Sequence, residues 1–270
     1  MRSFTLVVMA GLLVSPLFAQ QPSAVTRDQQ AVTLLGQALT VAGGTTAIAA
    51  ITDYTATGNG TWYQSADRTF DGTVTISGTA SGQLRFDANL PTGVRSYSVN
   101  HGHSAWKTED ERLIQGPAPG VRVPSSDAFP YTAPMFAEAF ASPHFGIAGV
   151  LNDSALEVLY KGSVQLGGLS AHEIQVRRLL PGRSNPNDPL AEYNTTYFFI
   201  DATTFQVVMT QDAIPRHVIH QLRYSDYRPV GGVLVPFSIT ESMGGQQIWA
   251  IHLDQVNFNS GLQDSSFQLQ

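Results

Sequence analysis

Two histidines one residue apart are the first candidates for chemistry in this sequence. His101 and His103 form an H-x-H pattern, and alternate residues of a β-strand point to the same face. Two imidazoles on one face can bind a metal ion such as zinc, which needs at least one further protein ligand. That ligand would come from His144, His217, His220 or His252. Because Asn100-His101-Gly102 also has the composition of a hairpin turn, we favour two polar residues that flank a turn, and predict no metal site.

The sequence has no signature of nucleophilic or phosphate chemistry. Gly168-Leu169-Ser170-Ala171-His172 is nearest to the G-x-S-x-G pattern of hydrolases, but it has no final glycine and leads into a strand. His172-Glu173 begins the H-E-x-x-H zinc pattern, but position 176 is valine. Glycine-rich phosphate loops are absent from the sequence. We therefore predict no catalytic residues, no cofactor and no enzymatic activity.

A third polar group, Asp226-Tyr227-Arg228, lies between two runs of alternating apolar and polar residues. Gly231-Gly232 follows it, and glycine supplies the positive backbone angles that a tight hairpin needs. Pro236 in the second run predicts an edge or a bulge nearby, because proline cannot donate to the hydrogen-bond ladder of a sheet. We interpret the group as the corner of a sheet, held by an Asp–Arg pair and a tyrosine ring, and not as a reaction centre.

The elements that must position these residues are mainly strands. From Asp53 onward apolar residues recur with a period of two, and glycine pairs or short polar runs separate about eleven strands. The connections are short, which favours antiparallel neighbours in one meander. No internal repeat or linker divides the chain, so we predict a single domain of mainly β (α+β) class.

The segment before these strands is helical. Val32, Leu35 and Leu39 recur at helical spacing, and Thr26 or Asp28 can cap the start of the helix. Gly43-Gly44 ends it, because glycine adopts the left-handed conformation at a helix C-terminus at low cost. A second helical turn is expected over residues 45–51.

Residues 1–19 have the layout of a secretory signal peptide: one cation, an apolar run from Phe4 to Val14, and Ala19 at a small-residue cleavage position. The run is too short to span a bilayer, and no later stretch is apolar enough for a membrane-spanning helix. We expect residues 20–270 to form the mature domain, located in the periplasm or secreted. The sequence has no cysteine, so neither a disulfide nor a cysteine-linked lipid anchor can form.

The charge of the chain argues against nucleic acid as a partner. The formal net charge is −6, and the 15 lysines and arginines are scattered along the sequence. Binding to nucleic acid needs a basic stripe that replaces counterions on the phosphates. A basic patch for anionic lipid headgroups is missing for the same reason.

Residues 109–150 interrupt the strands with an apolar and aromatic segment. A short helix is predicted from Pro134 to Ala141, with Pro134 in its first turn and Ser142-Pro143 at its end. We predict that residues 129–145 form the lid and lower wall of an apolar cavity. The alternative is that the same side chains only fill the core, and the sequence favours neither. The predicted ligand-binding residues are Phe129, Tyr131, Met135, Phe136, Phe140 and Phe145.

Residues 194–270 carry a recognisable order of parts: a strand that ends in Asp201 at a turn, a further strand, the stretch SDYRPVGGVLVP, and a last strand with the residues QVNFN. This order resembles the last strands of LolA-like proteins, which are periplasmic lipoprotein carriers, and of the related sensor MucB/RseB. The resemblance implies an unclosed barrel of about eleven antiparallel strands, with N-terminal and lid helices and a concave face that binds acyl chains. It also implies an arginine that locks the lid, for which Arg68, Arg85 and Arg95 are candidates.

The resemblance therefore predicts a binding or carrier protein for a hydrophobic ligand, such as a lipid or an acylated protein, with an envelope protein as a further partner. Two alternatives stay open. The first is a structural or signalling module that binds a protein partner through its sheet. The second, which the residues favour less, is a metal-assisted hydrolase that uses His101 and His103.

We predict that a bacterial host exports the protein and removes residues 1–19. The signal peptide provides the recognition, and the missing cysteine leaves no acceptor for a lipid. Mass spectrometry of the exported protein should give an unmodified chain that begins at Gln20. A mass that includes residues 1–19, or a lipid adduct, would contradict the prediction.

Overall fold

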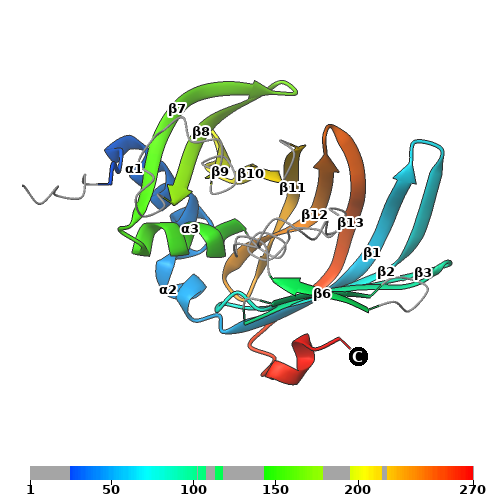
Figure 1. Cartoon of the computed structure of the whole chain (residues 1–270). Coiled ribbons are helices and arrows are strands. Elements are labelled where there is room, and N and C mark those ends of the chain that lie inside the picture. Colours follow the sequence, from blue (N-terminus) through cyan, green and yellow to red (C-terminus); the bar gives the residue numbers. More distant parts are fainter. Residues whose placement is uncertain are drawn as a thin grey trace, which may run out of the picture.

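The computed structural model describes residues 25–101, 103–107, 113–117, 143–178, 195–214 and 218–269. In these ranges thirteen strands form one antiparallel sheet, where the sequence predicted about eleven (Figure 1). The strands are β1 (Asp53–Ser65), β2 (Arg68–Thr79), β3 (Leu84–Leu90), β4 (Gly93–Asn100), β5 (His103–Lys107), β6 (Leu113–Pro117), β7 (Leu156–Leu166), β8 (Leu169–Arg178), β9 (Thr195–Asp201), β10 (Val207–Ile214), β11 (Val218–Val230), β12 (Val233–Met243) and β13 (Gln246–Phe258). The helices are α1 (Gln29–Val41), α2 (Gly44–Ala49), α3 (Pro143–Asn152) and the 3-10 helix η2 (Asp264–Phe267). No helix in the described ranges is both long and apolar enough to cross a membrane.

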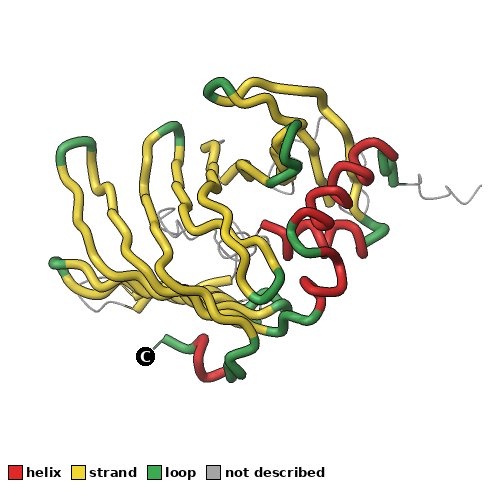
Figure 2. The backbone as a smooth tube through the Cα atoms, turned by 180° about the vertical axis from the view of Figure 1, so that it is seen from behind, coloured by secondary structure: helices red, strands yellow, loops and turns green. Residues whose placement is uncertain are grey.

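The sheet is a meander whose two halves are joined by its first and last strands. The order across the sheet is β6-β5-β4-β3-β2-β1-β13-β12-β11-β10-β9-β8-β7, so every neighbour but one is consecutive in sequence. The exception is β1, which pairs with β13 from Tyr54 opposite Phe258 to Trp62 opposite Trp249. The outer strands β6 and β7 do not pair with each other, and the sheet is an open half-barrel with helices α1, α2 and α3 at one end (Figures 1 and 2). The predicted unclosed antiparallel barrel is confirmed.

Three of the hairpins turn on glycine pairs. Both glycines have positive φ at each turn, with 61° and 92° at 167–168, 57° and 86° at 231–232, and 57° and 79° at 244–245. Two successive positive angles match the right-handed twist of the flanking strands, which is why two-residue hairpins select glycine. The three turns that the sequence predicted at glycine pairs are therefore confirmed.

One face of the whole sheet carries a continuous core, and that face is concave. Phe86 on β3 and Trp249 on β13 have two strands between them, yet their ring centroids are 5.2 Å apart. In a flat sheet, three strand spacings would separate these residues by about 14 Å. Arg95 on β4 likewise lies 3.9 Å from the ring centroid of Trp62 on β1. We call this concave side the inner face, and the end of the half-barrel with α1, α2 and α3 the helix end.

Helix α1 crosses the helix end of the sheet. Asp28 caps it, accepting hydrogen bonds from the backbone of Gln30 and Ala31 at 2.7 and 3.2 Å, as the sequence predicted. At the other end of α1, the backbone N–H of Leu234 on β12 donates to the carbonyl of Ala42 at 2.9 Å. Gly43 follows with φ 125°, and a Cβ there would lie 2.4 Å from the carbonyl oxygen of Gly232. Only glycine therefore fits where α1 meets β12.

Helix α3 begins where the sequence predicted a helix to end. Pro143 is its first residue, because proline fits the first helical turn, where a backbone N–H has no acceptor. Proline also commonly follows the end of a preceding helix, and the sequence pattern alone did not distinguish a helix start from a helix end at Pro143. The helix predicted from Pro134 to Ala141 lies outside the described residues.

The corner at residues 226–228 is structural, as predicted. Asp226 has φ 54° and accepts two hydrogen bonds from the guanidinium of Arg228, at 2.6 and 3.0 Å. The guanidinium also lies 4.6 Å from the ring centroid of Phe237. Pro236 is paired with a residue of β11 but has no partner on β13, because the pairing of β12 with β13 begins at Ser238. The proline therefore lies at a local edge of the sheet.

We predict opposite effects on stability for two glycine-to-alanine changes. In Gly58→Ala the new Cβ would lie 2.1 Å from the carbonyl oxygen of His252 and 2.7 Å from the Cα of Leu253, so β1 and β13 must move apart. The expected cost is about 1–3 kcal/mol of unfolding free energy. Gly36→Ala, in helix α1 with no atom within 4 Å of the new Cβ, should instead stabilise by about 0.5–1 kcal/mol. Urea denaturation of both variants tests this, and a neutral Gly58→Ala would contradict the tight β1–β13 contact.

Candidate functional site

The inner face holds a hollow at the helix end. It has a volume of about 300 Å³ and lies between α3, the start of β1, the β2–β3 turn and the ends of β7 and β8. Apolar side chains and the glycines of α3 line one part of it, and polar side chains, including an ion pair at its edge, line the rest. The residues that define it are Tyr54, Phe145, Gly149, Val150, Leu156 and Arg178.

Phe145 is the predicted ligand-binding residue that the structure places in this hollow. Its ring stacks on that of Tyr54, with centroids 5.9 Å apart and planes 11° from parallel. Tyr54 reaches this position because residue 78 is glycine: a Cβ there would lie 2.2 Å from the Tyr54 hydroxyl. The other predicted ligand-binding residues lie outside the described residues: Phe129, Tyr131, Met135, Phe136 and Phe140.

Helix α3 is held at both of its ends. Near its start, His144 is buried and its ring meets the edge of Tyr227 at 5.9 Å, while the Tyr227 hydroxyl donates to the carbonyl of Val207 at 2.5 Å. Burial lowers the pKa of His144 to about 4, so the imidazole is neutral near pH 7. This end of α3 is therefore fixed by ring packing rather than by charge.

The C-terminal end of α3 is held by Arg27. Its guanidinium donates to the carbonyls of Asp153, Val150 and Leu156 at 2.7, 3.0 and 3.2 Å. Cations satisfy the free carbonyls at a helix C-terminus and interact favourably with its dipole. The backbone on either side of Arg27 is bound to β7, because Asp28 donates to the carbonyl of Val158 and Val158 donates to that of Thr26. Arg27 therefore joins three elements around the hollow.

The arginines that the sequence analysis offered as lid locks have other contacts. Arg68 lies over the ring of Phe70, Arg95 lies over the rings of Trp62 and Trp106, and Arg85 pairs with Asp87 and donates to the backbone of residues 266 and 268. The arginine whose hydrogen bonds hold the end of α3 is Arg27, which the sequence analysis missed. Its partners are more than 120 residues away in sequence, and no local pattern marks it.

The edge of the hollow is polar. Arg178 pairs with Asp153 at 2.7 Å. The backbone N–H of Ala155 and the Arg178 guanidinium lower the pKa of the Asp153 carboxyl, which is ionised near pH 7. An apolar interior with a charged edge is the arrangement that admits an apolar chain and leaves a polar group at the surface.

The far end of the inner face, opposite the helix end, is filled by aromatic rings. Trp62 stacks on Phe70 at 5.6 Å and on Trp249 at 6.5 Å. Arg95 lies between the rings of Trp62 and Trp106. Ring faces attract cations, so these contacts hold an arginine within an apolar surface.

A cluster of charged groups adjoins these rings, which we call the acid cluster: Asp212, His220 and Glu241. The two ring nitrogens of His220 lie 2.7 Å from Asp212 and 3.1 Å from Glu241. Burial alone would lower the pKa of His220, but its two carboxylate partners outweigh burial and raise it to about 10. The sequence analysis treated His220 only as a distant metal ligand, because the contacts arise from strand register.

The remaining histidines do not converge on His101 and His103. His101 has φ 46° at the β4–β5 turn and pairs with Asp264 at 3.3 Å, while His252 lies on the opposite face of β13 from the core. His217 lies outside the described residues. Within the described ranges no three histidine, cysteine, aspartate or glutamate side chains are grouped as a metal ion would need.

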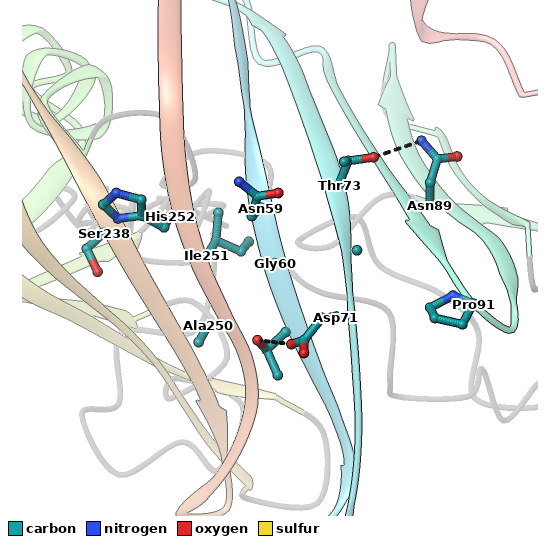
Figure 3. A pocket seen from close by; sticks show the side chains of 12 residues that line it. Asn59, Gly60, Asp71, Thr73, Asn89, Pro91, Ser238, Ala250, Ile251 and His252 are labelled. Atoms are coloured by element: carbon teal, nitrogen blue, oxygen red, sulfur yellow. Dashed lines mark hydrogen bonds between the residues drawn. The ribbon is translucent and has the colours of Figure 1, made fainter.

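A second hollow lies on the outer face of the sheet, across β12, β13, β1, β2 and β3 (Figure 3). Its volume is about 670 Å³, and its side chains are polar. They are bound to one another: Thr61 donates to Asp71 at 2.6 Å, and Asn89 donates to Thr73 at 3.3 Å. This open outer trough lies on the face of the sheet away from the core and does not match the predicted cavity.

No family model matches the sequence, and no curated protein matches it. Solved structures match the fold. A LolA superfamily protein from Nitrosomonas europaea is 7% identical, with a TM-score of 0.53 over 88% of this chain and 97% of that one. A domain assigned to outer membrane lipoprotein sorting, from Vibrio parahaemolyticus, is 9% identical, with a TM-score of 0.51 over 88% and 96%. The chain has a LolA-like fold. A DUF1329 family protein from Desulfovibrio piger, 8% identical with a TM-score of 0.51, shares this architecture.

We predict that Arg27→Met detaches α3 from the LolA-like sheet. Three hydrogen bonds from a charged donor are lost, and the expected cost is about 2–3 kcal/mol of unfolding free energy. Hydrogen exchange should show α3 opening faster, while β1 and β13 remain protected. Arg228→Met is the matched control, because its ion pair lies at an exposed turn and should be worth about 1 kcal/mol or less. Equal losses in the two variants would contradict the role of Arg27.

Proposed function

We propose that this protein is an exported binding protein that carries an apolar ligand, such as an acyl chain, within its half-barrel. The observation that carries the proposal is the hollow at the helix end, where the stacked rings of Tyr54 and Phe145 and the residues of α3 place apolar side chains beside the core. Its volume of about 300 Å³ is at the lower end of the range for small-molecule sites.

Three further observations support this proposal. Structures with the same fold include a LolA superfamily protein and a domain assigned to outer membrane lipoprotein sorting. The signal-like first nineteen residues favour export to the periplasm or the medium. The charged groups at the hollow, Asp153 and Arg178, are paired with each other. Such a pair is better suited to orienting a ligand than to acting as a general acid or base. We therefore propose binding without catalysis, with a free lipid or the acyl chain of an envelope protein as the cargo.

The proposal predicts that a side chain placed at position 149 blocks the ligand without harming the fold. Gly149 lines the hollow from α3, and no atom lies within 4 Å of a Cβ built there. Gly149→Leu should keep or slightly raise the stability, since leucine favours a helix more than glycine does. It should weaken binding of the neutral fluorophore N-phenylnaphthylamine by about tenfold, or ~1.4 kcal/mol.

Gly36→Leu is the matched control, because Gly36 also has open space around it but lies on α1 and away from the hollow. This variant should bind the fluorophore like the native protein. Native protein that does not bind the fluorophore would overturn the proposed function. Equal binding by Gly149→Leu and Gly36→Leu would place the ligand elsewhere.

A further inference from the structure

One inner-face position places an acidic group in a mainly apolar row. Residues paired across adjacent strands point to the same face, and the strand register gives the row Ile174, Phe198, Thr210, Leu222, Glu241, Trp249, Trp62 and Phe70, from β8 to β2. Six of these eight side chains are apolar or aromatic. Glu241 is the one with an acidic group, and its side chain is 0% exposed.

Glu241 has an unused acceptor. Its Oε1 lies 3.1 Å from the Nε2 of His220, but its buried Oε2 has no hydrogen-bond partner. Buried acceptors in proteins are nearly always satisfied, and leaving one without a donor is unfavourable. A ligand that donates a hydrogen bond to this oxygen would therefore stabilise the protein.

The surroundings of this oxygen favour a cation as the donor. Asp212 and Glu241 provide two carboxylates, and His220 between them provides one positive charge when both of its nitrogens are protonated, so the acid cluster has an excess of acidic groups. Burial raises the pKa of Glu241, and a further cation would favour its ionised form. Trp249, opposite Glu241 in the register, also touches Trp62 and Phe86, whose ring faces attract cations.

The acid cluster lies near the end of the strands, away from the helix end. Asp212 is two residues before the end of β10 and His220 is two residues after the start of β11. The Asp212 side chain is 27% exposed, while His220 and Glu241 are buried behind it. The cluster therefore extends from solvent into the inner face, as a headgroup site beside an apolar interior would.

We propose that the acid cluster recognises the headgroup of an amphiphile that carries an ammonium group. The Oε2 of Glu241 accepts a hydrogen bond from the ammonium, the ring of Trp249 packs against it, and the apolar chain runs along the inner face. This inference deepens the proposed function and rests on it. A carboxylate headgroup meets two acidic groups at the same place and is disfavoured.

Displacement of N-phenylnaphthylamine tests the proposal with two probes of equal chain length, dodecylamine and dodecanoate, at pH 7 and physiological salt. One charge-assisted hydrogen bond should give dodecylamine an advantage of about tenfold. In Glu241→Gln the two probes should bind with about equal affinity, because the amide lacks the charge. Asp71→Asn is the matched control: it removes one negative charge from the outer trough, away from the cluster, and should keep the advantage.

A second variant covers the case in which Glu241→Gln does not fold. Asp212→Asn alters the partly exposed end of the cluster and should also reduce the advantage. Equal affinities of the two probes for the native protein would overturn the headgroup site, and so would an unchanged advantage in both Glu241→Gln and Asp212→Asn. In either case binding of the neutral fluorophore would leave the proposed function standing, whereas its failure to bind would overturn the proposed function itself.

Discussion

A single antiparallel sheet with most of its core on one face excludes water from that core by curving around its own side chains. In the described residues the main core lies on one side of the sheet, and only Ala171, Phe199 and Met209 form a small separate cluster. The contacts of Phe86 with Trp249 and of Arg95 with Trp62, each across three strand spacings, are the result. The half-barrel, its concave interior and the positions of the helices all depend on this curvature.

The curvature leaves two ends with different chemistry. At the helix end one side of the recess is formed by α3, which Arg27 and His144 hold in place, and the stacked rings of Tyr54 and Phe145 lie beside polar groups. At the other end the strands bring tryptophan rings together with Arg95 and the acid cluster. Each end therefore combines apolar surface with charge.

The sequence predicted those parts of the fold that local chemistry controls. Glycine pairs required positive φ, Asp28 could cap a helix, and the period of two placed most strands, because each depends on neighbours in sequence. The start of α3 was missed, since Pro143 serves equally well as a stop or a start.

The candidate site was less predictable. The sequence predicted Phe145 as a ligand-binding residue from its aromatic segment; the structure places it in the lining of the recess, and its binding role stays a prediction. The roles of Arg27 and Glu241 could not be read from the sequence. Arg27 binds carbonyls more than 120 residues away, and Glu241 meets His220 only after β11 and β12 adopt their register. Such contacts are properties of the assembled sheet and have no local signature.

The pairing of β1 with β13 has a consequence for how the chain folds. These strands lie at opposite ends of the sheet-forming sequence, and closing so long a loop carries a high entropic cost before any contact compensates for it. The other neighbouring strands are consecutive in sequence, so β1–β13 is the one pairing in the described sheet that needs such a long loop to close. A chain that emerges from its N-terminus would present β1 and β2 long before β13 is available, so the first half cannot complete its core. Late folding of this kind leaves the apolar strands of the first half exposed, and in need of protection from aggregation, until the last strand arrives.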